Sequence, residues 1–485
     1  MSVDAAPRPR IVVVGAGITG LAAALRVAQA AAPVDLVVCE AGPRPGGVIA
    51  TERAGEGGEY LVEAGPDSFL TEKPEALRWC DRLGIADRLI GIRRDAGRIY
   101  VVHRGGLVPI PEGFRLVAPT RLVPWLRSPL FSWPGKLRMA MDCVLPRGPA
   151  AADESVAAFV IRRFGREVFD RVAQPMIGTI YTGDATALSL AATMPRLLEV
   201  ERRYRSVTLG LARAQNPGRR LGIFATPRDG MQTLVDAATA RLPASVLRLR
   251  TPVTALTRTR DDAYAVTLAG GEILDADAVI LTVDARGAAR LVGALDAALA
   301  AQLSAITYAS SVSVTLAYRR AEIRHPLDGA GFVVPSVERR PILAASFSSV
   351  KFAGRAPSDR VLVRVFLGGA LAPEMAGLDG ARLVAIVRAG MEPLIGAAGA
   401  PHLVRVFRHG DAMPQYVVGH LERIAGIEGR LAHHPGLALA GAAYRGIGIS
   451  DCIRSGEAAA DRALEFIGPR RGGDRARREV RRQPG

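Results

Sequence analysis

The sequence predicts an α/β fold that begins with a parallel β-sheet, and the first thirty residues carry this prediction. Residues 11–14, IVVV, form a short β-branched segment of the kind found at the centre of a parallel sheet. Gly15, Gly17 and Gly20 follow, and an alanine-rich helix is predicted over residues 19–30. Strand, G-x-G-x-x-G turn and helix in this order are typical of a Rossmann-like unit.

Each glycine of this turn has its own role in binding a dinucleotide. Gly15 permits the sharp turn, Gly17 lets the backbone approach a pyrophosphate, and Gly20 lets the helix pack on the sheet. The positive end of the helix dipole faces the phosphates. The next strand ends in Glu40, where a carboxylate accepts a hydrogen bond from a ribose hydroxyl. We predict a dinucleotide site; the alternative is a glycine turn without a ligand.

The residues after Glu40 favour FAD over NAD. Arg44, Gly46 and Gly47 follow the second strand directly, so a loop can fold back over the pyrophosphate beside an arginine. A nicotinamide-binding domain does not usually carry this element. Near the other end of the chain, residues 446–451 offer a glycine-rich turn and a helix N-terminus, whose dipole favours the negative charge of a reduced flavin.

Composition and charge narrow the class of protein. The 485 residues are enough for two or three domains, and 49% hydrophobic with 5% aromatic residues is typical of a globular protein. The chain shows no apolar run long enough for a membrane span and no secretion signal. Its four scattered cysteines form no C-x-x-C pair, which favours the cytoplasm, without a disulfide framework or a metal site.

The formal net charge is +16, from 63 basic and 47 acidic residues, and part of the excess lies in residues 468–485. This basic tail lacks apolar periodicity and is predicted to be disordered. Binding to nucleic acid, binding to an anionic membrane surface and simple solvation all fit such a tail, and nothing in the sequence separates them. Nucleic acid is not a partner that we expect.

Six segments together resemble the flavin-dependent, oxygen-dependent protoporphyrinogen and coproporphyrinogen III oxidases of haem biosynthesis. They are EAGPDSFL, GRIYVVHRGGLVPIP, IYTGDATALSLAATMPRL, VFLGGA, PQYVVGHLERI and AGAAYRGIGISDCIRSG. The resemblance covers residues 10–467, and the last two segments are the most specific. Related amine oxidases and carotene desaturases share the first and last glycine motifs but not the middle segments.

The resemblance implies three domains. A discontinuous FAD-binding domain would comprise residues 1–96, 226–294 and 424–467. An α+β substrate domain would comprise residues 97–113, 206–225 and 295–423. A mostly helical domain over residues 114–205 touches the membrane in relatives, and its segment TRLVPWLRSPLFSWPGKLRMAMDCVLP mixes basic and aromatic with apolar residues as an interfacial segment does. A plain amphipathic core helix and loop explains that segment equally well.

The resemblance also implies the residues that bind the cofactor, FAD. They are Gly15, Gly17, Gly20, Glu40, Arg44, Gly46, Gly47, Val48, Gly65, Pro66, Asp67, Ser68, Val253, Ala442, Ile447, Gly448 and Ile449. Val253, in the predicted strand LRLRTPVTAL, would meet the adenine through its backbone.

The substrate would be a porphyrinogen, a large apolar macrocycle with carboxylates, which needs a hydrophobic slot and a cation at its rim. Arg98 would pair with a propionate, and Met176, Val333 and Phe366 would line the slot. The alternatives are a solvated strand arginine and ordinary core residues. Thr179 stands where the family commonly has glycine, so its side chain would add bulk beside the slot; a one-residue shift gives the same pattern. Whether coproporphyrinogen III or protoporphyrinogen IX is preferred stays open.

In the chemistry that the resemblance implies, flavin N5 takes a hydride from a meso carbon, the partner nitrogen loses a proton and O2 reoxidises the flavin. Three cycles remove six electrons and yield three H2O2. No protein residue is assigned as catalytic. Two other functions stay open: a flavin amine oxidase with Tyr444 as one aromatic wall, and a non-catalytic escort protein on the same fold. A homodimer and a peripheral membrane contact also stay open.

Overall fold

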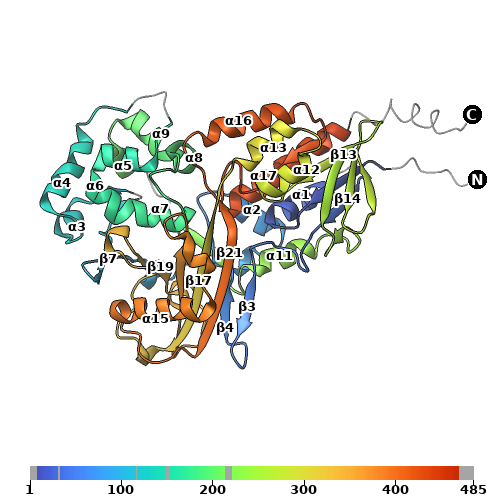
Figure 1. Ribbon diagram of the computed structural model, residues 1–485. Helices are drawn as coiled ribbons and strands as arrows, with labels where there is room; N and C mark the ends of the chain where they lie inside the picture. The colour runs from blue at the N-terminus through green and yellow to red at the C-terminus, as the bar shows by residue number, and fades with distance from the viewer. Residues whose placement is uncertain (1–7, 31–32, 116, 149–152, 214–220, 469–485) are drawn as a thin grey trace, which may run out of the picture.

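The computed structural model describes residues 8–30, 33–115, 117–148, 153–213 and 221–468. It shows three regions: a parallel sheet with its helices, a long antiparallel sheet, and a helical region beside the antiparallel sheet (Figure 1). The predicted basic tail lies outside the described residues except for Gly468.

The parallel sheet joins strands from the beginning, middle and end of the chain, which confirms the predicted α/β class. Its order is β12-β2-β1-β16-β22, and every neighbouring pair is parallel. The bounds are Arg10–Val14 for β1, Asp35–Cys39 for β2, Leu247–Arg248 for β12, Ala278–Leu281 for β16 and Leu437–Leu439 for β22. The central strands are buried because both faces of the sheet are covered.

Helices cover one face of this sheet, where alternate residues such as Val13 and Val38 pack. These helices are α1 (Ile18–Ala28), α2 (Glu75–Arg82), α11 (Gln232–Thr239) and α17 (Ile449–Ile467). The other face packs on a three-stranded sheet and further helices. These are β13 (Val253–Arg258), β14 (Tyr264–Leu268), β15 (Ile273–Ala276), α12 (Ala285–Val292), α13 (Ala297–Ser304) and α16 (His420–Leu431).

The predicted strand LRLRTPVTAL is divided in the structure into β12 and β13. Arg250, between them, has a left-handed backbone with φ of 50°. Pro252 lacks the N–H that a continuous ladder would need. The chain therefore turns away from the parallel sheet after Arg248 and starts a new sheet at Val253.

The antiparallel sheet has seven strands in the order β21-β17-β20-β19-β18-β7-β8, and only β18 and β7 run parallel to each other. The bounds are Ile99–His103 for β7, Gly106–Pro109 for β8, Tyr308–Arg319 for β17, Gly331–Val333 for β18, Ile342–Ser346 for β19, Arg360–Gly368 for β20 and Leu403–Pro414 for β21. One face packs on α15 (Gly380–Ile395), and the other faces the helical region.

Short elements connect these sheets. The hairpin of β3 (Thr51–Ala54) and β4 (Tyr60–Glu63) reaches β21, where Arg405 pairs with Glu52 at 2.7 Å (Figure 1). A small sheet of β5, β11 and β6 lies near α17. Its bounds and those of α14 are Phe69–Leu70 for β5, Phe224–Pro227 for β11, Leu89–Gly91 for β6 and Ser348–Lys351 for α14.

The helical region lies at the upper left of Figure 1. Its elements are β9 (Phe114–Arg115), β10 (Ala118–Pro119), α3 (Leu122–Arg127), α4 (Trp133–Ala140), α5 (Val156–Phe164), α6 (Arg166–Val168), α7 (Gln174–Tyr181), α8 (Leu190–Thr193), α9 (Pro195–Tyr204) and α10 (Val207–Arg213). A π-helical turn, Phe169–Ala173, precedes α7.

The structure differs from the expected boundaries at residues 206–225, which the resemblance assigned to the substrate domain. Val207 and Leu211 of α10 are buried in the apolar cluster of the helical region. Phe224, at the start of β11, pairs with β5 instead of the seven-stranded sheet. Both described ends of this segment therefore lie outside the seven-stranded sheet.

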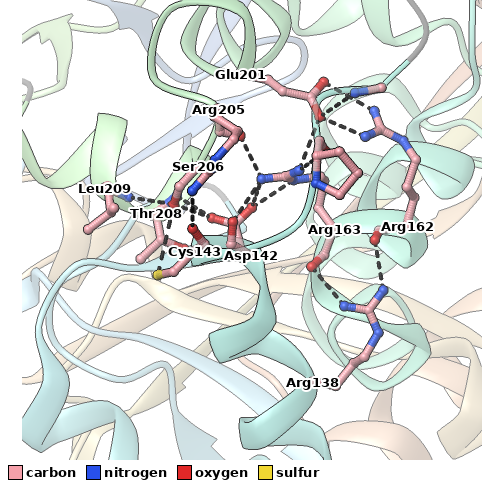
Figure 2. Close-up of polar contacts among 12 residues, drawn as sticks. Arg138, Asp142, Cys143, Arg162, Arg163, Glu201, Arg205, Ser206, Thr208 and Leu209 are labelled. Atoms are coloured by element: carbon pink, nitrogen blue, oxygen red, sulfur yellow. Dashed lines mark hydrogen bonds and ion pairs between the residues drawn. The ribbon is translucent and has the colours of Figure 1, made fainter.

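A buried ion pair holds the helical region together (Figure 2). Arg163 of α5 is fully buried and donates to Asp142 and to the carbonyls of Pro146 and Arg205. The second oxygen of Asp142 accepts from the Ser206 hydroxyl at 2.7 Å and the Thr208 backbone N–H at 2.8 Å. Arg163 also lies 3.4 Å from Glu201, whereas Asp142 pairs with no second cation among the described residues, so removing Arg163 would leave a buried carboxylate uncompensated, at a cost of about 3–5 kcal/mol.

Candidate functional site

The first glycine turn has an open face suited to a pyrophosphate. Gly15 has φ of +101°, a conformation that favours glycine. A Cβ on Gly20 would lie 1.9 Å from the Gly15 carbonyl oxygen, so only glycine allows this close packing. A Cβ on Gly17 would meet no atom within 4 Å. Helix α1 has neither a capping side chain nor an acidic residue in its first turn, which leaves its N-terminal N–H groups available to an anion.

The second glycine loop lies directly against the first. Gly46 donates to the Ala16 carbonyl at 2.8 Å and forms an isolated bridge with Gly17. The Arg44 guanidinium donates to the carbonyl oxygens of Gly47 and Ile49, each at 2.8 Å. Arg44 therefore braces the loop. The half-exposed Val48 stands at its tip, and the Val48 carbonyl lies where a Cβ on Gly65 would be, at 1.9 Å.

Glu40 organises the turn at the end of β2. Its two carboxylate oxygens accept from the backbone N–H groups of Ala16 and Gly42, each at 2.7 Å. The Thr251 N–H bonds to the Glu40 carbonyl at 2.8 Å, which brings the start of β13 at Val253 to the same sheet edge. Glu40 and Val253, the two residues predicted to bind the adenosine of FAD, are therefore carried by adjacent segments.

The Gly-Pro turn carries a buried ion pair. Asp67 accepts from the Lys351 ammonium at 2.9 and 3.0 Å and from the Ser68 hydroxyl at 2.7 Å. Burial raises the pKa of Asp67, but the charge and hydrogen bond of Lys351, the Ser68 hydroxyl and the Arg364 charge together outweigh burial and lower the pKa to about 2. Asp67 is thus ionised and fixed at neutral pH, and Gly65, Pro66 and Ser68 are held with it.

The C-terminal motif is fixed by two side chains that sequence reasoning did not single out. The Tyr416 hydroxyl donates to the Ala442 carbonyl at 2.7 Å and accepts from the Gly446 N–H at 2.8 Å. The His420 ring stacks on Tyr416, with centroids 3.9 Å apart, and donates through Nε2 to the Tyr444 carbonyl. Tyr416 and His420 both lie in the segment PQYVVGHLERI. That segment carried part of the family resemblance, but neither residue was assigned a role from the sequence.

Gly448 precedes α17, which has no capping side chain at its N-terminus. Backbone donors at Ile447–Ile449 therefore follow the turn that Tyr416 fixes. Lys73 pairs with Asp451 in the first turn of α17 at 2.5 Å, and the Ser450 hydroxyl bonds to the Lys73 carbonyl. These contacts connect the segment after the Gly-Pro turn to the start of α17.

The three apolar residues predicted for the slot come together. Met176, Val333 and Phe366 belong to one cluster between the helical region and the seven-stranded sheet. Ala344 pairs with both Val333 and Phe366, so these two strand residues lie on one row of the sheet. Met176 reaches the row from α7.

Thr179 lines a cavity of about 180 Å³ beside this cluster. Its hydroxyl donates to the Pro175 carbonyl at 2.7 Å. Gln174 and Arg340 also line the cavity and supply polar groups that sequence reasoning did not identify. Neither the apolar strand pattern nor the motifs point to Arg340, because it follows a short turn between β18 and β19.

The structure does not bring Arg98 together with the apolar residues of the slot. The Arg98 guanidinium pairs with Asp328 at 2.5 Å and its side chain is 65% exposed. Tyr100 donates to the same carboxylate and packs on the sheet face toward α15, whereas Val101 packs with Met176 on the opposite face.

Tyr444, the aromatic wall of the amine oxidase alternative, is 7% exposed and packs in the core with Val14 and Leu281. Its position in the core gives no support to an aromatic cage at this residue.

Comparison with known proteins decides the family. Residues 18–464 match the model of the flavin containing amine oxidoreductases. The chain belongs to this family.

This oxidoreductase is similar to named porphyrinogen oxidases along nearly its full length. It is 34% identical to a coproporphyrinogen III oxidase of Bacillus subtilis, covering 95% of this chain and 99% of the relative. It is 32% identical to the protoporphyrinogen oxidase of Homo sapiens, covering 93% and 97%. The crystal structure of a protein described as a protoporphyrinogen oxidase from Exiguobacterium sp. 255-15 has a TM-score of 0.85 and 29% identity, covering 95% and 99%.

Proposed function

We propose that this flavin-containing oxidoreductase converts a porphyrinogen to the porphyrin, with FAD as its cofactor and O2 as its electron acceptor. The observation that supports this most is the meeting of the two glycine loops at Gly17 and Gly46, beside the N-terminus of α1, which has no capping side chain. The long similarity to coproporphyrinogen III and protoporphyrinogen oxidases favours a porphyrinogen over an amine as substrate.

The chain offers a complete set of groups for FAD. Gly15, Gly17 and Gly20 with the N–H groups of α1 would hold the pyrophosphate, covered by Gly46 and Gly47. Glu40 and Val253 would hold the adenosine. The ring would lie against Val48, the turn of Gly65, Pro66, Asp67 and Ser68, and the backbone at Ala442, Ile447, Gly448 and Ile449. Bound there, FAD would supply two-electron oxidation by accepting hydride.

The protein's residues would bind and orient the macrocycle. Met176, Val333 and Phe366 offer an apolar wall, and Gln174, Thr179 and Arg340 offer polar groups for its carboxylates. Arg98 stays a predicted propionate partner. Each cycle would remove a hydride from a meso carbon and a proton from a ring nitrogen, and O2 would take the two electrons and two protons as H2O2. Three cycles would yield the porphyrin.

Anaerobic titration of the holoprotein with coproporphyrinogen III and, separately, protoporphyrinogen IX tests this function. We expect at least one porphyrinogen to bleach the flavin absorbance, and admitting O2 to yield three H2O2 per porphyrin. A properly folded protein that stays colourless with added FAD would support the escort alternative. Bleaching by amines and by neither porphyrinogen would support the amine oxidase alternative and overturn the proposal.

We also propose a peripheral contact of the helical region with an anionic membrane surface. Trp133 and Leu137 of α4 are 71% and 70% exposed, and Leu122 and Val144 are similarly open. Arg121, which pairs with Glu112, and Arg127 are exposed at the two ends of α3, whereas Lys136 is buried and donates to the Leu126 carbonyl. In the described residues, no helix is both long and apolar enough to cross a membrane. A location in the cytoplasm and a homodimer stay predictions.

Sedimentation with phosphatidylcholine vesicles, with and without phosphatidylglycerol, tests this contact. Replacing both Trp133→Ser and Leu137→Ser should weaken binding to the anionic vesicles more than tenfold, because each buried apolar side chain contributes about 1.5–3 kcal/mol. Ile273→Ser, at an exposed position of β15, is the matched control and should leave binding unchanged. Equal binding by wild type and the double variant contradicts the contact.

A further inference from the structure

Arg364 is a buried cation whose charge has no carboxylate partner among the described residues. It lies on β20, a strand with neighbours on both sides, and is 5% exposed. The carboxylate that interacts most strongly with its charge is that of Asp67, and Asp67 already pairs with Lys351. A buried guanidinium that lacks a counter-charge is costly, so such a group is retained where its charge serves a purpose.

The hydrogen bonds of Arg364 direct it to the Gly-Pro turn. Its Nη atoms donate to the Gly65 carbonyl at 2.6 Å, the Ala64 carbonyl at 2.8 Å and the Ser313 hydroxyl at 3.1 Å. Its Nε is buried and has no hydrogen-bond partner in the described part of the chain. All three partners are neutral, so they hold the guanidinium in place without forming an ion pair, and the carboxylates of Asp67 and Glu63 act on its charge without a hydrogen bond to it.

The guanidinium also contacts the slot. It stacks on the Phe366 ring, with the guanidinium carbon 4.9 Å from the ring centroid. Phe366 belongs to the apolar wall with Val333 and Met176, while Gly65 lies against the Val48 carbonyl of the second glycine loop. Arg364 therefore connects the loops assigned to FAD with the wall assigned to the macrocycle.

We propose that Arg364 is a positioning residue that fixes the Gly-Pro turn against the FAD ring and places beside it a positive charge that no carboxylate of the described residues pairs with directly, raising the flavin's affinity for electrons. This inference rests on the proposed FAD site. A fixed cation in a water-poor site stabilises the negative charge that reduction places on the ring. It would equally stabilise the negative adduct of sulfite with oxidised flavin, which gives a readout independent of turnover.

The test measures sulfite affinity and midpoint potential of the FAD-loaded protein. Arg364→Met keeps an unbranched, flexible side chain, although a shorter one, and removes the charge. We expect its sulfite dissociation constant to rise at least tenfold and its two-electron midpoint potential to fall by about 30 mV, the equivalent of a tenfold change. Arg364→Lys retains a cation and should restore most of both values.

Arg355→Met is the matched control. Arg355 is 2% exposed, and it too donates to backbone carbonyls, those of Arg228 and Pro227. Its charge, however, lies 3.9 Å from Glu63 and is thus partly balanced. General loosening of the core would change both variants alike, whereas the proposal expects sulfite affinity in Arg355→Met to stay within twofold of wild type.

Unchanged sulfite affinity and potential in Arg364→Met, or equal shifts in Arg355→Met, overturn the inference. If Arg364→Met does not fold, Arg364→Lys is compared with Arg364→Gln, and equal sulfite affinities of these two overturn it instead. A different result would contradict the proposed function: a wild-type protein that takes up no FAD, or whose flavin is bleached by neither porphyrinogen. If a porphyrinogen bleaches the wild-type flavin but the Arg364 variants have the same potential as the wild type, only the inference about Arg364 is refuted and the proposed function stands.

Discussion

At the scale of single residues, the site depends on charges whose partners lie far away in the chain. Asp67 pairs with Lys351 and Arg98 with Asp328, contacts that span more than two hundred residues. The family resemblance pointed to Asp67 and Arg98 but carries no information on such partners. Arg364 was missed for a similar reason: in the sequence it is one polar residue in an apolar strand, and only its contacts reveal its position.

The Asp67–Lys351 pair predicts a specific pH dependence of stability. The pKa of Asp67 is about 2 in the folded protein and 3.8 as a free group, so the pair's stabilisation is complete above pH 4 and is lost as pH falls through 2. Lys351→Met should therefore reduce the free energy of unfolding by on the order of 2 kcal/mol at pH 7. Urea unfolding at matched FAD concentration and several pH values checks this, and the two curves should converge toward pH 2.

The Arg98–Asp328 pair makes the propionate assignment testable. If Arg98 binds a propionate, its loss in Arg98→Ala should raise KM about tenfold, as expected for a hydrogen bond to a charged group. Asp328→Asn removes the competing carboxylate and should lower KM. Steady-state kinetics with both porphyrinogens measure these effects. If neither change alters KM, Arg98 is a solvated strand arginine and the cation that lines the cavity, Arg340, becomes the candidate.

At the scale of elements, a close helix–helix contact joins α1 to α17. A Cβ on Gly456 would lie 2.2 Å from the Thr19 carbonyl oxygen, so even alanine must push the two helices apart. Gly456→Ala should destabilise the protein by about 1–3 kcal/mol and weaken FAD binding, because both helices start at the proposed FAD site. Thermal unfolding and FAD titration measure the two effects. Gly429→Ala in α16, where a Cβ meets nothing within 4 Å, should instead stabilise slightly.

Sequence patterns predicted the position of a strand or helix well where a single local rule determines it. The strand, turn and helix at residues 10–28 follow from apolar periodicity and glycine spacing, and the start of α17 follows from its glycine turn. Local patterns carry less where tertiary contacts decide: α10 packs in the helical region because Val207 and Leu211 fit that cluster, and no local pattern states which core a short helix joins.

At the scale of the whole molecule, FAD would bind segments from both ends of the chain at once. Ligand that binds only the folded state stabilises it, by about 2.7 kcal/mol at a hundredfold excess over Kd. We expect the melting temperature to rise with FAD concentration. Riboflavin, which lacks the pyrophosphate and adenosine, should have little effect, because Gly17, Glu40 and Val253 would find no partner. Equal shifts from both compounds would contradict the assigned pyrophosphate and adenosine sites.

The strand order β12-β2-β1-β16-β22 has a consequence for biosynthesis. On the ribosome, β1 and β2 emerge early, but β16 cannot acquire its outer neighbour until residue 437 has left the exit tunnel. For the intervening interval a hydrophobic edge is bare, and unpaired edges promote aggregation of nascent chains. Truncated products that end before β22 should therefore be insoluble in cells, and the release of residues 437–439 sets the moment at which the edge of β16 becomes covered.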